Sequence, residues 1–447
     1  ASLRLNTTGS SNVGLGYEAL KSNTTASYNT AVGYQSLKAN TTATNNVSIG
    51  AFSLALNTTG EANTSVGLAA MDANTTGSNN VALGREALGG NTTASYNTAL
   101  GYQASLNATT GSVNTFVGGL SAGFGVVTGS HNVGLGAETL YRLTSGGSNV
   151  SIGYQALQFN TTGSSNVAIG REALENNTSG NVNTATGHNA LLTNTTGFEN
   201  TASGANSLKL NTTGYYNSSF GSGSLLSNTT GIQNTAVGRY ALFSNTTDNS
   251  NTAVGYQSLY ANTGTSNTAV GISSGTSTTT GDNNNSFGNA AGRDITTGNG
   301  NTCLGHYSGS SSYPTFHITT QSDRITVGNS LSTNAYVKVA WTVTSDARDK
   351  TNINPIPHGL EFVQQLNPVS YNFKKSREDS TPHGNKRYGF LAQDILALEG
   401  DDNVIIDNEQ TDHLKYQTES LVPVLVKAIQ ELSATNDALV ARITALE

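Results

Sequence analysis

The chain is poor in the residues that disulfide-stabilised domains and metalloproteins use. Its 447 residues include one cysteine, Cys303, one methionine and one tryptophan. A single cysteine excludes an internal disulfide framework and a multi-cysteine metal site. A formal net charge of −7 provides no basic footprint for nucleic acid. No apolar run is long enough to span a bilayer and no signal peptide is visible, so we expect no nucleic-acid partner and no membrane insertion. Export would then use another route, such as release by lysis, unless the start of the chain has been removed.

The sequence also offers little for cofactor chemistry. The histidines of the second half, His306, His317, His358, His383 and His413, are scattered without the spacing of metal ligands. No pair of carboxylates stands in a context that suggests glycoside hydrolysis. We therefore expect no cofactor, no metal and no metabolic or glycosidase activity.

Proline and charge are distributed unevenly along the chain. The first 300 residues contain no proline and 20 of the 49 charged residues, although they are two thirds of the sequence. All six prolines, from Pro314 to Pro423, lie in the remaining 147 residues. Such a shift in composition marks a domain boundary. We expect a repeat shaft over residues 1–308, a β neck over 309–344 and a separate domain over 345–447.

The first part is a repeat. A block Asn-(Val/Thr)-x-(Val/Ile/Leu)-Gly recurs, nearly always at 17-residue intervals, with one interval of 18 and one of 16. The blocks begin at Asn12, Asn29, Asn46, Asn63, Asn80, Asn97, Asn114, Asn132, Asn149, Asn166, Asn183, Asn200, Asn217, Asn234, Asn251, Asn267, Asn284 and Asn301. A glycine follows each Asn four positions later. A leucine usually follows eight positions later, and an Asn-Thr-Thr-Gly-like turn separates most blocks.

Seventeen residues hold two short strands and two turns but not a helical hairpin, so the repeat predicts a β-solenoid. Eighteen rungs spaced by about 4.8 Å predict a rod on the order of 85 Å long. The glycine suits a turn with positive φ, and the Asn columns are expected to stack into side-chain amide ladders.

We expect two inward columns, one of leucines such as Leu20 and Leu37, and one of Val32, Ile49, Val66, Ile152, Ile169 and Val237. The alternate strand positions, such as Ala31 and Ala82, are also small and apolar. A strand that is apolar on both faces is usually covered on both, so we infer that neighbouring chains cover the second face. The pattern resembles the β-roll heads of trimeric autotransporter adhesins and the repeats of phage tail fibres.

Three other interpretations of the repeat fit the sequence less well. Disorder fits the composition but not the regular spacing. The Asn-x-Thr triplets are formal glycosylation acceptors, but turn residues that recur because the turn recurs explain them more simply. Threonine columns on a flat solenoid can bind ice, although here the Thr pairs fall in turns rather than on a strand face.

The second part carries specific motifs. Arg324–Gly328 and Tyr336–Val343 are expected to be strands of the neck. They are followed by Ser345-Asp-x-Arg-x-Lys350, by Leu366-Asn-Pro-Val before an aromatic strand, and by Tyr388-Gly-Phe-Leu-Ala-Gln-Asp394. In this order the motifs resemble the C-terminal intramolecular chaperone domain of phage endosialidases and related tail fibres. The resemblance implies a small α+β domain that ends in a helix and acts on a homotrimer.

The resemblance also implies that the chaperone releases itself by one cut. Ser345 would be the nucleophile, Lys350 the base, and Thr344–Ser345 the bond that is cleaved, in a single-turnover serine peptidase. Without these motifs, two solvated loop residues would be the simpler interpretation of this spacing. Asp346, Arg348 and Asp349 are expected to be structural or orienting.

The chain ends in heptads that predict a coiled coil over about 419–447. Its alternating core positions are Val422, Leu425, Ile429, Leu432, Asn436, Leu439, Ile443 and Leu446. Ile at one position and Leu at the other favours two strands, and Asn436 fixes register rather than number. The resemblance implies three strands.

These features favour a viral (phage) tail fibre or spike that attaches to a host surface, located in the virion and extracellular after release. Its expected partners are two further copies of the chain, a host receptor that is a glycan or an outer-surface protein, and other tail proteins at the N-terminus. A bacterial surface adhesin with a β-roll head is the alternative. A membrane-tethered transcription factor with the same chaperone would need a DNA-binding domain and a transmembrane helix.

Overall fold

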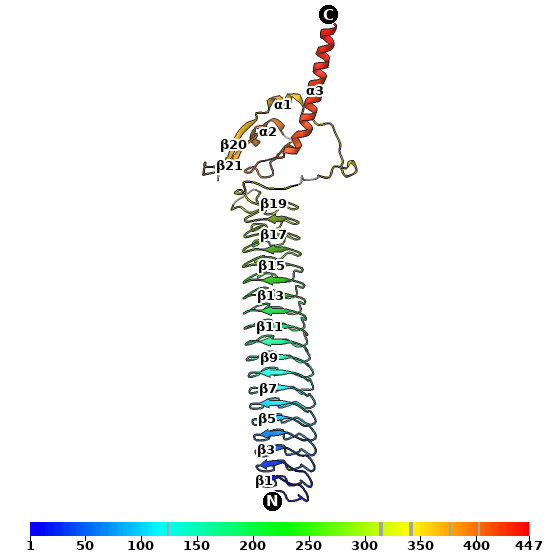
Figure 1. The fold of residues 1–447 in the computed structure, drawn as a ribbon, viewed down its shortest axis with the longest axis vertical. Coiled ribbons are helices and arrows are strands. Elements are labelled where there is room, and N and C mark those ends of the chain that lie inside the picture. The colour runs from blue at the N-terminus through cyan, green and yellow to red at the C-terminus, as the bar shows by residue number, and fades with distance from the viewer. Residues whose placement is uncertain (123–124, 313–315, 339–342, 375–376, 401–402, 447) are drawn as a thin grey trace. The chain divides into compact units, whose positions relative to one another are not determined.

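The computed structural model describes residues 1–122, 125–312, 316–338, 343–374, 377–400 and 403–446. The chain separates into two compact units, Ala1–Val327 and Gly328–Glu447, which are described one at a time. The fold is mostly β, as expected: a parallel β-solenoid precedes a small α+β unit with a long C-terminal helix (Figure 1).

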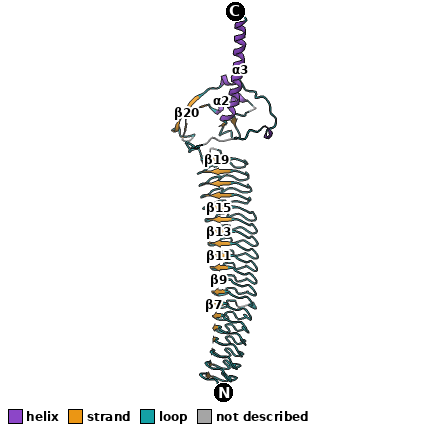
Figure 2. Cartoon of the chain, turned by 45° about the vertical axis from the view of Figure 1, so that its right-hand side comes forward, coloured by secondary structure: helices purple, strands orange, loops and turns teal. Residues whose placement is uncertain are grey.

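In the solenoid each coil contributes one three-residue strand, and the strands stack in parallel into one sheet. Turns occupy most of each coil (Figure 2). The strands are β1 Val13–Leu15, β2 Thr30–Val32, β3 Val47–Ile49, β4 Thr64–Val66, β5 Val81–Leu83, β6 Thr98–Leu100, β7 Thr115–Val117, β8 Val133–Leu135, β9 Val150–Ile152, β10 Val167–Ile169, β11 Thr184–Thr186, β12 Thr201–Ser203, β13 Ser218–Phe220, β14 Thr235–Val237, β15 Thr252–Val254, β16 Thr268–Val270, β17 Asn285–Phe287, β18 Thr302–Leu304 and β19 Ile325–Val327.

The solenoid extends further along the chain than the 17-residue period predicts. β19 pairs in parallel with β18, Thr302 facing Ile325, across a last coil of 23 residues. The segment expected as the first strand of a neck is therefore the nineteenth strand of the sheet. Of the second expected strand, residues 336–338 are not in a strand, and residues 339–342 lie outside the described residues.

The inward column of the strand was predicted wrongly. In every solenoid strand from β2 to β19 the middle residue is buried and the two outer residues are not, so that Ala31 is buried and Ile49 is 41% exposed. Val32, Val66, Ile152, Ile169 and Val237 occupy the same outward position as Ile49. The reason is space: the fully buried leucines, Leu20 and its equivalents, fill most of the interior and in most coils leave room only for a small side chain such as alanine or serine opposite them.

The leucine column is buried as predicted, and the glycine has the predicted conformation. Gly33, for example, has a φ of 133°, which L-residues rarely adopt. A Cβ at this position would also lie only 2.5 Å from the carbonyl oxygen of Gly50 in the next coil. Stacked corners of this kind need glycine both for the dihedral angle and for the close approach of the backbones.

Two buried ladders of asparagine amides run along the solenoid. In the ladder that precedes the strands, the backbone N–H of Asn46 donates to Oδ1 of Asn29 at 3.0 Å, and its Nδ2 donates to the carbonyl of Gly60 at 3.0 Å. In the ladder of the opposite turn, Nδ2 of Asn40 donates to Oδ1 of Asn23 at 3.0 Å. The amide ladders predicted from the repeat are confirmed, and they satisfy polar groups that the interior removes from water.

One pair of coils departs from the small-residue interior. Phe116 in β7 points inward and is fully buried where other coils have alanine or serine. The residue beside it in β8 is Gly134, whose added Cβ would lie 2.9 Å from Cδ1 of Phe116. The coil between them is the one with 18 residues. The bulky ring and the missing side chain therefore form a matched pair that occurs at one height of the shaft.

The second unit contains short elements around one core. They are the 3₁₀ turn η1 Ala347–Asp349, α1 Leu360–Gln365, β20 Val369–Lys374, β21 Pro382–Gly389, α2 Ala392–Glu399, β22 Ile406–Asp407, β23 Lys415–Tyr416 and α3 Thr418–Thr444. β20 and β21 form an antiparallel hairpin, and Phe362, Ile395, Ile405, Ile406, Leu421 and Val424 form the buried core. Among the described residues no helix is long and apolar enough to cross a membrane.

We predict that Asn200→Ala destabilises the shaft strongly. Loss of the amide leaves the buried backbone N–H of Asn217 without a partner, while the carbonyl of Gly214 keeps the hydrogen bond from Nδ2 of Asn211. An unpaired buried group costs about 1–3 kcal/mol, so the free energy of unfolding should fall by about that amount in denaturant titrations followed by circular dichroism. Thr213→Ala, which truncates an exposed side chain nearby, is the control. Equal stability of the two variants would contradict the role of the ladder.

We also predict that Gly134→Ala destabilises the shaft by about 1–3 kcal/mol, because the added methyl overpacks the site against Phe116. Phe116→Ala alone should also destabilise, because it leaves a cavity. The double variant restores the alanine pair found at Ala168 and Ala185 and should be more stable than the sum of the single changes predicts. Strict additivity in thermal unfolding would argue against a matched pair.

Candidate functional site

The sequence from Ser345 to Lys350 folds into a tight turn that brings its two ends together. Asp346 caps the 3₁₀ turn Ala347–Asp349, its carboxylate accepting from the backbone N–H of Arg348 at 2.9 Å. The guanidinium of Arg348 donates to both oxygens of the same carboxylate, at 2.6–3.1 Å. These hydrogen bonds lower the pKa of the Asp346 carboxyl and raise the pKa of Arg348. The turn is thus held by an ion pair between residues two positions apart.

The turn places the two residues singled out as a dyad in contact. Nζ of Lys350 donates a hydrogen bond to Oγ of Ser345 at 2.7 Å. Thr344, Ser345 and Lys350 are all exposed in the single chain. A serine hydroxyl becomes a nucleophile when a neighbouring base takes its proton, and a lysine can be that base only in its neutral form. The geometry supplies the contact, with the ammonium as donor to the hydroxyl oxygen.

Asp346 and Arg348 act on this site through the backbone. Neither side chain has a recorded contact with the Ser345 hydroxyl or the Lys350 amine, and their ion pair fixes the turn between them. Sequence reasoning assigned them to a structural or orienting role, and the cap geometry supplies the physical basis for it. The spacing of acid and base across one residue is the signal that predicts such a turn.

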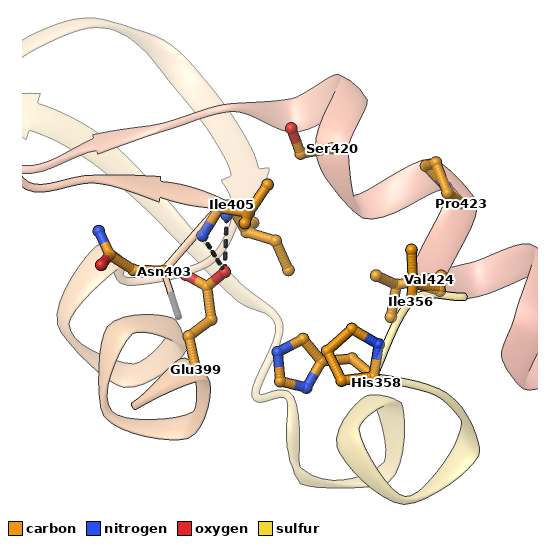
Figure 3. A pocket seen from close by; sticks show the side chains of 10 residues that line it. Ile356, His358, Glu399, Asn403, Ile405, Ser420, Pro423 and Val424 are labelled. Atoms are coloured by element: carbon orange, nitrogen blue, oxygen red, sulfur yellow. Dashed lines mark hydrogen bonds between the residues drawn. The ribbon is translucent and has the colours of Figure 1, made fainter. Parts of the chain in front are cut away.

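A pocket of about 610 Å³ lies beside the start of α3 (Figure 3). Ile356, Ile405 and Val424 contribute apolar walls, and His358 and Glu399 are its principal polar groups. Nε2 of His358 is buried without a hydrogen-bond partner, and its ring lies 4.3 Å from that of Phe362. Sequence reasoning treated this histidine as a surface or core residue, and nothing in its spacing indicates a pocket.

Glu399 is a residue that sequence reasoning missed. Its buried carboxylate accepts from the backbone N–H groups of Val404, Ile405 and Ile406 at 2.6–3.0 Å. It thereby ties the end of α2 to the loop that leads into β22. A glutamate at the last position of a helix is ordinarily a solvent-facing residue, so only the fold reveals this contact.

The predicted coiled-coil positions lie on one exposed face of α3. Ile429 is 66% exposed, and Val422, Leu425, Leu432, Leu439, Ile443 and Leu446 are exposed as well. An adjacent face near the helix start packs on the domain through Leu421, Val424 and Ala428. Glu431 accepts from the backbone N–H of Leu360, and Lys427 donates to the carbonyl of Ile356, both at 2.7 Å. The domain therefore holds one face of α3 by these contacts, and the heptad positions remain exposed.

Comparison with known proteins finds a family match within the second unit. Residues 345–404 match the family model described as chaperone of endosialidase. The match begins at Ser345, the first residue of the dyad. Neither the curated proteins nor the solved structures contain a match to this chain. The chain thus joins a parallel β-solenoid to a chaperone domain of the endosialidase type. Within the described ranges, no group of three or more His, Cys, Asp or Glu side chains could hold a metal ion.

Proposed function

We propose that the chain is a homotrimeric tail fibre or spike of a virus that attaches to a host surface, and that its C-terminal chaperone domain assembles the trimer and releases itself by cleavage at Thr344–Ser345. The observation that carries the proposal is the outward stripe of aliphatic residues on a shaft that is followed by a chaperone domain. Bacterial viruses are the expected source, and the virion the expected location.

The stripe is formed mainly by the third residues of the strands, because the first residues are mostly threonine. Leu83 is 49% and Phe220 44% exposed, and most coils present Val, Ile or Leu at the third position. A monomeric protein rarely exposes an apolar patch of more than a few hundred Å². The stripe continues over nearly the whole sheet. The surface that would cover it best is therefore one of equal length with the same repeat. Further copies of the same shaft have that property.

The exposed heptads of α3 support the same association at the other end of the chain. All eight predicted core positions are exposed, while the domain holds an adjacent face of the helix. The heptad residues by themselves favour two strands, and the resemblance to the chaperone family implies three. Three chains are proposed on the strength of that resemblance.

The chaperone would act by fixing register. Any coil can pair with another after a slip of one repeat at nearly equal energy, because the contacts repeat. Helices that associate first place the chains in register at one end, and the shafts then close toward the N-terminus. Cleavage afterwards leaves a fibre that cannot return to its assembly-competent form, which is kinetic stabilisation.

The proposed cleavage has two steps, formation of an ester and its hydrolysis. Oγ of Ser345 attacks the carbonyl carbon of Thr344 as Lys350 accepts the hydroxyl proton. The peptide nitrogen of Ser345 leaves with a proton returned from Lys350, and an ester now joins the two residues. Water hydrolyses the ester and yields the carboxylate of Thr344 and a chaperone that begins with the amine of Ser345. Since burial favours a neutral lysine, covering of this exposed turn during assembly would couple cleavage to trimer formation.

Cleavage is tested by Ser345→Ala and Lys350→Met. We expect wild type to release a fragment of about 100 residues on denaturing gels and both variants to remain full length. Lys350→Arg should also fail, because arginine stays protonated. Ser380→Ala and Lys386→Met change exposed residues of the same domain and should cleave normally. Release of the fragment by Ser345→Ala would disprove the dyad.

Assembly is tested by deleting residues 345–447. We expect the truncated shaft to aggregate or to remain monomeric, since its aliphatic stripe lacks a guide to register. Native gels and light scattering of the refolded chain give the oligomeric state. A soluble native trimer formed by the truncated chain would refute the chaperone role.

A further inference from the structure

The side of the shaft carries a hollow of about 430 Å³ in the coils between Ser22 and Asp72. Its surface is formed by Phe52 and Leu56, by the small side chains Ala55 and Ala69, and by two ionisable residues, Lys38 and Asp72. All these residues follow the corner glycine of their coils. The hollow is therefore built by a different part of the coil from the strand stripe.

The hollow exists because these coils depart from the repeat. Ala55 occupies the position at which later coils carry Phe243 and Tyr260, nine residues after the ladder Asn. Ala69 occupies the position of Gln35 and Gln103, six residues after it. Two short side chains in adjacent coils leave a space that longer ones fill elsewhere.

A run of aromatic rings leads along the shaft to this space. The rings of Tyr17 and Tyr34 are stacked with centroids 5.2 Å apart, and Phe52 meets Tyr34 edge-on at 5.3 Å. All three side chains are exposed, Phe52 by 41%. The centroid spacing follows the rung spacing, so the rings present apolar surface at regular steps along the axis.

The polar groups of the hollow suit a neutral ligand that donates hydrogen bonds. Asp72 is half-buried, and burial raises the pKa of its carboxyl while the backbone N–H groups of Ala73 and Asp72 act in the opposite direction. Glu18 pairs with both Lys21 and Lys38, the latter at 3.0 Å, so these three groups and Asp72 together carry no formal net charge. A hollow without net charge offers no electrostatic preference for a charged ligand.

We infer that this hollow binds one neutral hexopyranose unit of a surface polysaccharide, with adjacent units lying along Phe52, Tyr34 and Tyr17. The inference rests on the proposed attachment function. A pyranose ring has an apolar C–H face that packs against aromatic carbon and a rim of hydroxyls that donate to carboxylate. Pockets of this size, with apolar walls and few polar groups, are typical of small-molecule sites.

The repeat itself supplies substitutions that alter the hollow and keep the fold. Ala55→Tyr fills the space with the residue that the shaft already carries at position 260. Phe52→Gln removes the aromatic wall with the residue found at the equivalent position 35, which has the same positive φ. The matched controls are Leu192→Tyr and Tyr240→Gln, which make the same kinds of change at the same positions of distant coils.

The full-length fibre and its variants are titrated calorimetrically with a panel of oligosaccharides of glucose, galactose and mannose. We expect wild type and both controls to bind at least one member, and Ala55→Tyr and Phe52→Gln to weaken that binding at least 10-fold. Assembled wild-type fibre that binds no member of the panel, or variants that bind as well as wild type, would overturn the hollow as a saccharide site.

The saccharide-site proposal and the assembly proposal can be disproved independently of each other. Oligomeric state and cleavage are read on gels, whereas saccharide binding is read by calorimetry. A cleaved trimer that binds no saccharide would disprove the hollow as a saccharide site and leave the assembly proposal standing. An uncleaved monomer whose binding still responds to Ala55→Tyr removes the assembly proposal alone.

Discussion

The stacking of identical backbone and amide groups from coil to coil is the interaction on which the rest of this structure depends. A coil of 17 residues has too little interior for an ordinary hydrophobic core, and much of that interior is polar asparagine. The amides of Asn29 and Asn46 are tolerated there because each coil presents donors and acceptors at the same height as its neighbours. Such a ladder works only in strict register, so it requires the period that the sequence shows.

The same constraint accounts for the unusual distribution of apolar residues. Because leucines and amides occupy the interior, the inward strand position in nearly every coil carries a small side chain, and larger aliphatic residues such as Ile49 lie outside. A narrow coil thereby acquires an apolar exterior along one face. In the proposed trimer the main hydrophobic contact would lie between chains, and the single chain would depend on a chaperone until that contact forms.

The sequence predicts the period, the glycine corners, the leucine column and the ladders, because each follows from one coil multiplied many times. It does not predict which strand face is inward, since Ala31 and Val32 are both apolar and only the space beside Leu20 decides between them. It also places β19 outside the shaft, because a 23-residue coil breaks the period that defines the pattern. Phe116 and Gly134 are easily passed over for the same reason.

For the candidate site, the spacing of Ser345 and Lys350 and the resemblance to a chaperone family identify the pair, and the turn capped by Asp346 explains how they meet. The buried contacts of Glu399 could not be predicted, because they join backbone groups that no side-chain pattern encodes. Prediction from sequence thus succeeds where the residue types themselves determine the local geometry. It fails where a contact depends on backbone groups that the fold brings close.

The pairing of Phe116 with Gly134 bears on how such a shaft changes length. Elsewhere one coil is nearly equivalent to the next, so gain or loss of whole coils during evolution leaves each remaining contact as it was. The matched ring and glycine are an exception, because they must stay in adjacent coils. This one junction serves as a fixed landmark in an otherwise interchangeable series, and shafts of different reach can arise by duplication on either side of it.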